Sequence, residues 1–342
     1  SEAEEEISSF AKKHNIPVIA TVMGIGCMHK DDPYYIGATG GLGEGSANNL
    51  SRDTDLALAI GTKLADFTTA SWTNFQNENF KLVSVNTSRF DTVKHRAFPV
   101  VSDAKIGLKE LSKALGDWKA PNGWYQRAIE EKIKWEEYVA KESGPTNQEL
   151  PSYAHAVGAV YRNSDPSDIV VTAAGGLVGE VVQIWKPKEI NTFETEWGFS
   201  CMGYEISGAL GIKMAKPDQD VVVFVGDGSY LLQNSDIYSS VLYDKKLIIV
   251  VCDNGGHMVI NRLQLAKGGK EYLCNLNAAG ATNLQFVDFE AHAKSMGANA
   301  ETVKSTSELE AAFKRAKASD KTYVISMKTD GYEWLELSLI HI

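Results

Sequence analysis

Short, continuous runs of β-branched and other apolar residues are the feature that most restricts what this chain can fold into. Four of them lie in the second half of the sequence, at residues 169–172, 221–225, 247–251 and 323–327. Runs of this length without polar alternation predict strands buried on both faces, as in parallel sheets covered by helices. Helical stretches separate them, at residues 203–215, 235–243 and 289–296. The second half is therefore predicted to be an α/β domain with a parallel sheet.

The first half shows the same alternation of helix and strand. A helix is predicted over residues 7–14, strands over 17–21, 55–60 and 80–85, and a glycine-rich loop over 37–45. We therefore predict an α/β protein with two doubly wound parallel-sheet domains, the first of them Rossmann-like. The predicted divisions are a domain at 1–118, a linker with a charged helix (124–141) at 119–149, a domain at 150–330 and a tail of uncertain structure at 331–342.

Composition excludes some classes of function. The 342 residues are 44% hydrophobic and 23% charged, with a formal net charge of -10. No basic cluster of the kind that binds nucleic acid is visible, and no apolar run approaches the ~18 residues of a membrane span. Four cysteines without a C-x-x-C pair predict reduced, mostly buried thiols and a cytoplasmic protein. A small-molecule ligand, with no nucleic acid or membrane partner, is expected.

The two ends of the sequence are unusual. It opens at Ser1 inside an amphipathic helical pattern and closes on apolar residues without a helix stop signal. We expect both ends to be truncations of a longer protein.

Two polar turns follow two of the predicted strands. Gly226-Asp227-Gly228 comes directly after residues 221–225, and Asp253-Asn254 comes directly after the next strand. Each alone is typical of an ordinary tight turn. The 27 residues from Asp227 to Asn254 leave room for one helix and one return strand, so the two side chains can face one point at the sheet edge. Carboxylate and amide oxygens suit Mg²⁺, with the carbonyl of Gly256 as a third ligand.

A third strand end is rich in small residues. Ala173-Ala174-Gly175-Gly176 follows the strand at 169–172 and leaves backbone N–H groups unobstructed before a helix. Such a loop can hold phosphate oxygens, although a plain strand-to-helix turn has the same sequence. A metal together with this loop would let an acidic protein hold a diphosphate.

The combination resembles the motif of thiamine diphosphate-dependent enzymes. Gly226-Asp227-Gly228, a spacer of residues 229–252 and Asp253-Asn254 match it, except that the family's first Asn is Asp253 here. The resemblance implies thiamine diphosphate and Mg²⁺ as cofactors, with Asp227, Asn254 and Gly256 as metal ligands. It implies Met202 as the residue that bends the cofactor into a V shape and Ser200 as a carbonyl partner of the aminopyrimidine. The full set of implied cofactor-binding residues is Gly175, Gly176, Ser200, Met202, Gly226, Asp227, Gly228, Ser229, Asn254, Gly256 and His257.

Longer stretches are similar to one subfamily, the trihydroxycyclohexane-1,2-dione hydrolases of myo-inositol catabolism. The similar stretches are residues 66–72, 86–91, 199–206, 225–231 and 260–264. The resemblance implies hydrolytic C–C cleavage of a cyclic 1,2-dione to 5-deoxy-glucuronic acid. It also implies a three-domain parent, a dimer or tetramer of identical chains, whose activating glutamate lies on a pyrimidine-binding domain. No residue here matches that glutamate, so the catalytic residue is unknown and the chain alone is expected to be inactive.

Several alternatives remain open at this stage. Met202 also fits plain core packing, and His257 also fits an ordinary surface or core histidine. The loop at 37–45 does not fit G-x-G-x-x-G, so we expect the first domain to bind no nucleotide. The same cofactor motif would serve an acetolactate-synthase-like carboligase or decarboxylase. A non-catalytic module that needs a separate pyrimidine-domain partner is a third reading, and a nicotinamide-dependent oxidoreductase is a more distant one.

Overall fold

The computed structural model of the chain describes residues 2–278, 280 and 282–335. These residues fall into two compact units, one up to Tyr138 and one from Val139 onward. The long helix α6 (Asn122–Glu142) contains this division. The apolar chain end at 336–342 lies outside the described residues, and the domain limits proposed from the sequence stay a prediction.

The first unit contains parallel strands with short helices between them. Strand β1 pairs with β2 in one parallel sheet, and β3, β4 and β5 form another. An apolar cavity of about 160 Å³ is lined by residues of β1, β3 and α1. The elements are α1 (Glu4–His14), β1 (Val18–Ala20), η1 (Val22–Gly24), β2 (Tyr35–Ala38), α2 (Gly45–Asp53), β3 (Leu56–Ile60), α3 (Asp66–Thr69), β4 (Lys81–Asn86), α4 (Arg89–Thr92), η2 (Lys94–Arg96), β5 (Phe98–Val101) and α5 (Ala104–Leu115).

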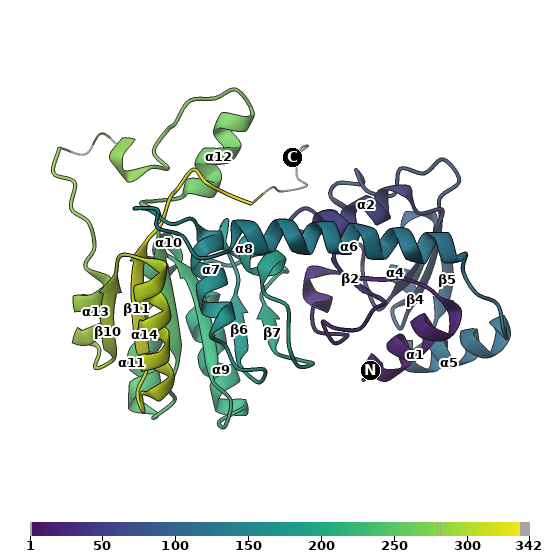
Figure 1. The fold of residues 1–342 in the computed structure, drawn as a ribbon, viewed down its shortest axis with the longest axis horizontal. Coiled ribbons are helices and arrows are strands. Elements are labelled where there is room, and N and C mark those ends of the chain that lie inside the picture. The colour runs from purple at the N-terminus through teal and green to yellow at the C-terminus, as the bar shows by residue number, and fades with distance from the viewer. Residues whose placement is uncertain (1, 279, 281, 336–342) are drawn as a thin grey trace. The chain divides into compact units, whose positions relative to one another are not determined.

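The second unit is built on one six-stranded parallel sheet with the strand order β10-β11-β9-β8-β6-β7 (Figure 1). Its strands are β6 (Ile169–Thr172), β7 (Phe193–Thr195), β8 (Val221–Gly226), β9 (Ile248–Asp253), β10 (Asn299–Val303) and β11 (Tyr323–Lys328). Its helices are α7 (Tyr153–Arg162), α8 (Leu177–Ile184), α9 (Tyr204–Ala215), α10 (Asp227–Leu232), α11 (Ser235–Leu242), α12 (Met258–Ala266), η3 (Leu276–Ala278), α13 (Phe289–Ser295) and α14 (Thr306–Ala318).

The core of the second unit explains why its strands carry no polar alternation. Along β8 the side chains of Val221, Val223 and Val225 pack on one face with residues of α9, α11 and α13. The intervening Phe224 contacts Trp185 on the other face, with ring centroids 6.0 Å apart. Helices therefore cover both faces, and every strand residue except the terminal Gly226 is buried.

The order of the strands creates a switch point at β6. The chain passes from β6 to β7 on one side and then returns to β8 on the other side of β6. In open parallel sheets, the crevice at such a reversal, beyond the carboxyl ends of the strands, is where ligands bind. The loops after β6, β8 and β9 are therefore the parts of this fold that can form a site.

The predicted α/β class is confirmed, and each strand named from the sequence coincides with an observed strand to within a residue or two. Two expectations were wrong. The loop predicted at 37–45 begins later, because β2 extends to Ala38. Among the cysteines only Cys252 is buried, whereas Cys201 is exposed and the other two are partly exposed. Cys252 is buried because it lies in strand β9 inside the sheet, whereas Cys201 lies in the loop before α9 and is exposed.

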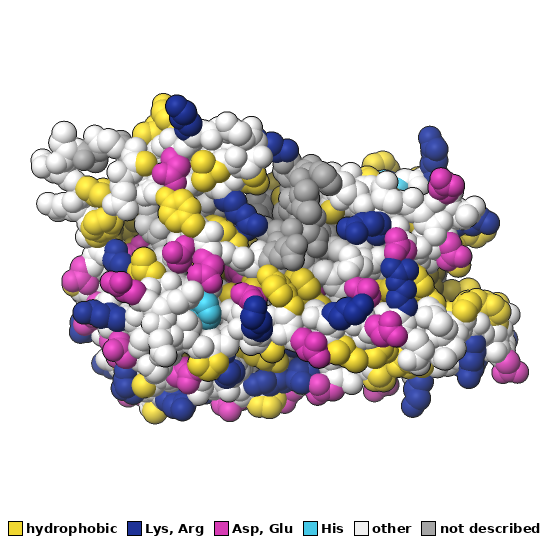
Figure 2. Space-filling model, turned by 45° about the horizontal axis from the view of Figure 1, so that its top comes forward, with side chains coloured by type: hydrophobic (Ala, Val, Ile, Leu, Met, Phe, Trp, Pro, Cys, Tyr) yellow, Lys and Arg dark blue, Asp and Glu magenta, His cyan; other side chains and the backbone are white. Residues whose placement is uncertain are grey.

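The surface carries charged side chains of both signs. On the face drawn in Figure 2, lysine and arginine side chains of the described residues alternate with acidic ones and do not gather into a tract. Within the described ranges, no helix combines the length and the apolar character needed to cross a membrane.

Candidate functional site: a cavity at the ends of β6, β8 and β9

The two strands that precede Asp227 and Asn254 lie side by side, as the sequence predicted. Strands β8 and β9 pair in parallel, with Gly226 opposite Cys252. Asp227 therefore follows one strand end at nearly the level at which Asn254 follows the other. Strand β6 flanks β8 on its other side, so the loop at Gly175 and Gly176 opens at the same edge of the sheet.

A cavity of about 230 Å³ lies at this edge. All eleven residues proposed from the sequence as cofactor-binding line it. Six further residues complete the lining: Tyr153, Ala174, Leu177, Met258, Val259 and Ile260. Ala174, Leu177 and Met258 directly adjoin proposed residues, and Val259 and Ile260 follow Met258 in the first turn of α12, so proximity in the sequence could have found these five. Tyr153 comes from α7, and no motif in the sequence links it to the site.

The Asp227 carboxylate is almost completely buried, at 5% exposure. Burial, and then the neighbouring carboxylate of Asp253, raise the pKa of Asp227 from 3.8 to about 7. The backbone N–H groups of Gly228 and Gly256 donate to it and partly oppose this rise. A buried acidic group that is held this unfavourably is what a cation would stabilise.

Asn254 supplies the second oxygen of the expected metal pair. Its side-chain oxygen is buried and has no hydrogen-bond partner among the described residues. A buried amide oxygen left without a partner costs free energy, and a metal ion would satisfy it. Among the described residues no cluster of three His, Cys, Asp or Glu side chains exists. The oxygen set of Asp227, Asn254 and a backbone carbonyl therefore fits Mg²⁺ rather than a transition metal.

Three glycines that line the cavity leave no room for a side chain. A Cβ on Gly228 would lie 2.8 Å from Cε1 of His257 and 3.3 Å from Cε of Met202. Gly256 has a φ of +143°, and a Cβ there would overlap the carbonyl of Cys274. A Cβ on Gly176 would overlap the ring of Trp334. A larger residue would therefore clash with cavity-lining side chains at Gly228 and with packed neighbours outside the cavity at Gly176 and Gly256.

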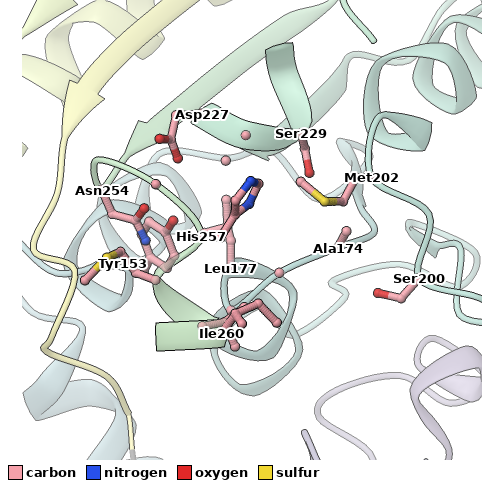
Figure 3. Close-up of a pocket in the computed structure, with 17 residues that line it drawn as sticks. Tyr153, Ala174, Leu177, Ser200, Met202, Asp227, Ser229, Asn254, His257 and Ile260 are labelled. Atoms are coloured by element: carbon pink, nitrogen blue, oxygen red, sulfur yellow. The ribbon is translucent and has the colours of Figure 1, made fainter. Parts of the chain in front are cut away.

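Met202 and Ser200 lie across the cavity from Asp227 and Asn254 (Figure 3). Met202 precedes Gly203, whose φ of +96° turns the chain into α9. Ser200 donates its hydroxyl to the carbonyl of Ala173, so its loop is tied to the end of β6. The side chain of Met202 is 37% exposed, which does not suit simple core packing. This placement is compatible with the proposed contact to a bent cofactor.

His257 occupies the middle of the view in Figure 3, between Asn254 and Asp227 on one side and Met202 and Ser229 on the other. Its backbone N–H donates to the carbonyl of Cys274 at 2.7 Å, which fixes the loop that enters α12. The imidazole lines the cavity and therefore lies where a bound ligand would contact it.

Comparison with known proteins agrees with this geometry. Residues 173–327 match the C-terminal TPP binding domain of thiamine pyrophosphate enzymes, and residues 1–111 match the central domain of the same enzymes. The chain belongs to the thiamine pyrophosphate enzyme family, and thiamine diphosphate is the cofactor of that family.

Its curated relatives point to one group within the family. The chain is 33% identical, over its whole length, to 3D-(3,5/4)-trihydroxycyclohexane-1,2-dione hydrolase of Halalkalibacterium halodurans, and spans 58% of that protein. It is 35% identical to the Listeria monocytogenes protein of the same name, with 96% of the chain and 55% of the relative covered. For the Bacillus subtilis protein the identity is 32%, with 100% and 58% covered. The chain thus spans a little over half the length of these relatives.

Proposed function

We propose that this chain supplies the diphosphate- and Mg²⁺-binding part of a thiamine diphosphate-dependent hydrolase that opens a cyclic 1,2-dione, trihydroxycyclohexane-1,2-dione, in inositol catabolism. The single observation that carries the proposal is the pairing of Asp227 and Asn254 at adjacent strand ends, with a buried, unpartnered amide oxygen beside a buried carboxylate. The names of the relatives support the choice of substrate.

The residues of the chain have separable tasks in this proposal. Asp227, Asn254 and the carbonyl of Gly256 would hold Mg²⁺, and the backbone at Gly175 and Gly176 would hold phosphate oxygens. Met202 would support the bend between the two rings of the cofactor, and the carbonyl of Ser200 would accept from its aminopyrimidine. When bound, the cofactor supplies a nucleophilic carbon that makes the bond between two carbonyl groups cleavable.

The net reaction is a hydrolysis. Water adds across the bond between the two carbonyl carbons of the ring, one of which becomes a carboxylic acid and the other an aldehyde, so that 5-deoxy-glucuronic acid forms without any oxidant or reductant. The activating glutamate is expected on a pyrimidine-binding domain, and identical chains would assemble to bring it to the cofactor. The 342-residue chain by itself is therefore proposed to bind the cofactor but to turn over little or no substrate.

A binding experiment tests the site. The chain is titrated with thiamine diphosphate by calorimetry in the presence of Mg²⁺ or of a chelator. We expect saturable, Mg²⁺-dependent binding that is lost in Asp227→Ala. A suitable matched control is Asp168→Asn, a buried carboxylate that pairs with Lys317 and lies before the first residue of β6, at the opposite sheet edge. Binding that is unaffected by Asp227→Ala would refute the assigned site.

An activity experiment tests the substrate. A full-length protein that contains this sequence is assayed with the cyclic dione and with pyruvate. Turnover of the dione supports the hydrolase, whereas turnover of pyruvate alone would favour the acetolactate-synthase-like alternative. Because the chain spans just over half of its relatives, a module that acts with a separate pyrimidine-domain chain is a second candidate. Activity that appears only when this chain is mixed with a separate pyrimidine-domain chain would favour that candidate.

A further inference from the structure

One buried carboxylate connects three of the segments that line the cavity. Glu205 lies in the first turn of α9 and is fully buried. One of its oxygens accepts the N–H of Ala174 at 3.2 Å, and the other accepts the N–H of Gly203 at 2.8 Å. The hydroxyl of Ser229 donates to the same carboxylate. All of these donors come from loops or helix starts at the carboxyl edge of the sheet.

The three donors belong to parts of the site with different tasks. Ala174 directly precedes the glycine pair that would hold the diphosphate. Gly203 directly follows Met202, which would support the bend in the cofactor. Ser229 closes the turn that contains Asp227. Glu205 itself does not line the cavity.

A negative charge at Glu205 is not expected in a site that serves only to bind an anion. Burial raises the pKa of Glu205, and the donated hydrogen bonds oppose only part of this rise. A carboxylate placed one side chain away from a diphosphate also repels it. The three donors from neighbouring segments, together with the N–H of Glu205 itself, offset much of the cost of burial, because hydrogen bonds to a charged acceptor are the strong ones. The remaining advantage of a carboxylate is geometric, since it can accept from several directions at once.

We propose that Glu205 is a positioning residue that sets the spacing between the diphosphate-holding loops and the segment that supports the bend of the cofactor. It acts through Ala174, Gly203 and Ser229 and does not touch the cofactor. The expected effect on cofactor binding rests on the proposed function. The carboxylate of Glu205 with its donors Ala174, Gly203 and Ser229, here called the clamp, is a property of the chain without ligand.

The first experiment needs no cofactor. Glu205→Gln replaces one acceptor oxygen by an NH₂ group that faces N–H donors, so at least one of the three hydrogen bonds is lost. In hydrogen–deuterium exchange of the ligand-free chain, we expect faster exchange in peptides that contain Ala174, Gly203 and Ser229. The strands of the sheet should keep their protection. Exchange that is unchanged, or that rises equally over the whole second unit, would overturn the clamp.

The second experiment measures cofactor binding. For Glu205→Gln we expect the Kd for thiamine diphosphate at saturating Mg²⁺ to rise about tenfold or more, which is the effect of losing a buried hydrogen bond to a charged group. Asp168→Asn is the matched control, because it also neutralises a buried carboxylate but at the other edge of the sheet. It should lower the melting temperature without changing the Kd. Equal Kd values for Glu205→Gln and the wild type would refute the positioning role.

A milder variant covers the case in which Glu205→Gln folds poorly. Ser229→Ala removes a single donor, and we expect faster exchange at Ala174 and Gly203 in this variant, since the carboxylate is then less constrained. Exchange at both positions identical to that of the wild type would count against the clamp. If the wild-type chain shows this exchange pattern but does not bind the cofactor, the proposed function fails while the clamp stands.

Discussion

The buried carboxylate of Asp227 predicts that the ligand-free chain loses stability as the pH rises. Because burial raises the pKa of Asp227 from 3.8 to about 7, the folded state favours the protonated form. The stabilisation from this group is complete below pH 3.8 and is lost as the pH passes through about 7. The difference between the two pKa values corresponds to roughly 4 kcal/mol at pH above 8.

Asp227→Asn isolates this contribution, because it keeps the shape of the side chain and removes its charge. In urea denaturation with a chelator present, we expect the variant to be more stable than the wild type by only about 1.5 kcal/mol near pH 5, because the loss begins once the pH exceeds 3.8. At pH 8.5 the variant should be more stable by up to ~4 kcal/mol. The other buried carboxylates titrate equally in both proteins and cancel in the comparison.

Addition of Mg²⁺ and thiamine diphosphate should narrow this difference at pH 8.5. At a ligand concentration of about 100 times Kd the wild type gains ~2.7 kcal/mol, whereas the variant, which lacks the carboxylate ligand, gains little. A difference between the two proteins that does not change with pH would refute the electrostatic reasoning. A wild type that is more stable at pH 8.5 than the variant in the chelator would refute it as well.

Outcomes are expected for four further variants. Asn254→Ala should abolish the stabilisation by Mg²⁺ and cofactor, which calorimetry measures. It should change the ligand-free stability, measured by urea denaturation, by less than about 1 kcal/mol, because the amide oxygen has no partner to lose. Gly176→Ala should destabilise the second unit by about 1–3 kcal/mol in urea denaturation, since its Cβ overlaps Trp334. In Gly175→Ala the Cβ meets open space, and only the strain of a φ of +77° remains, about 1 kcal/mol. Glu180→Gln should flatten the fall in melting temperature between pH 5 and 8, because burial raises the pKa of Glu180 from 4.5 to about 8 and its stabilisation is lost as the pH rises between those values.

The local parts of the site could be predicted because the information for them is local. Apolar runs mark buried strands, and the residues just after a parallel strand lie at the ligand-binding edge whatever the order of the strands. Asp227 and Asn254 are separated by one crossover, and crossovers of that length usually join neighbouring strands. Their pairing across β8 and β9 is therefore contained in the sequence, and so is the family to which it points.

The sequence alone did not indicate the short strands β2, β5, β7 and β10. Strand β5 has the sequence Phe98–Val101 with a proline in it and is largely exposed, so neither its pattern nor its burial marks it. Strand β7 has only three residues. Such strands form because a neighbouring strand already offers hydrogen-bond partners, which is a property of the sheet and not of the segment.

The sequence by itself determined the parallel α/β architecture through its apolar runs, and its resemblance to a family implied the cofactor and the eleven residues that meet in one cavity. The tertiary structure decided that Tyr153 would line that cavity from α7, that Trp334 would close over Gly176, and that Glu205 would join three loops. These contacts bring together residues far apart in the chain or on separate segments, and they depend on the strand order and on the packing of the helices. The spacing of residues along the sequence indicates neither the strand order nor the packing of the helices. The Gly226-Asp227-Gly228 turn can thus be predicted from the sequence, whereas the contacts that hold it in place depend on the fold.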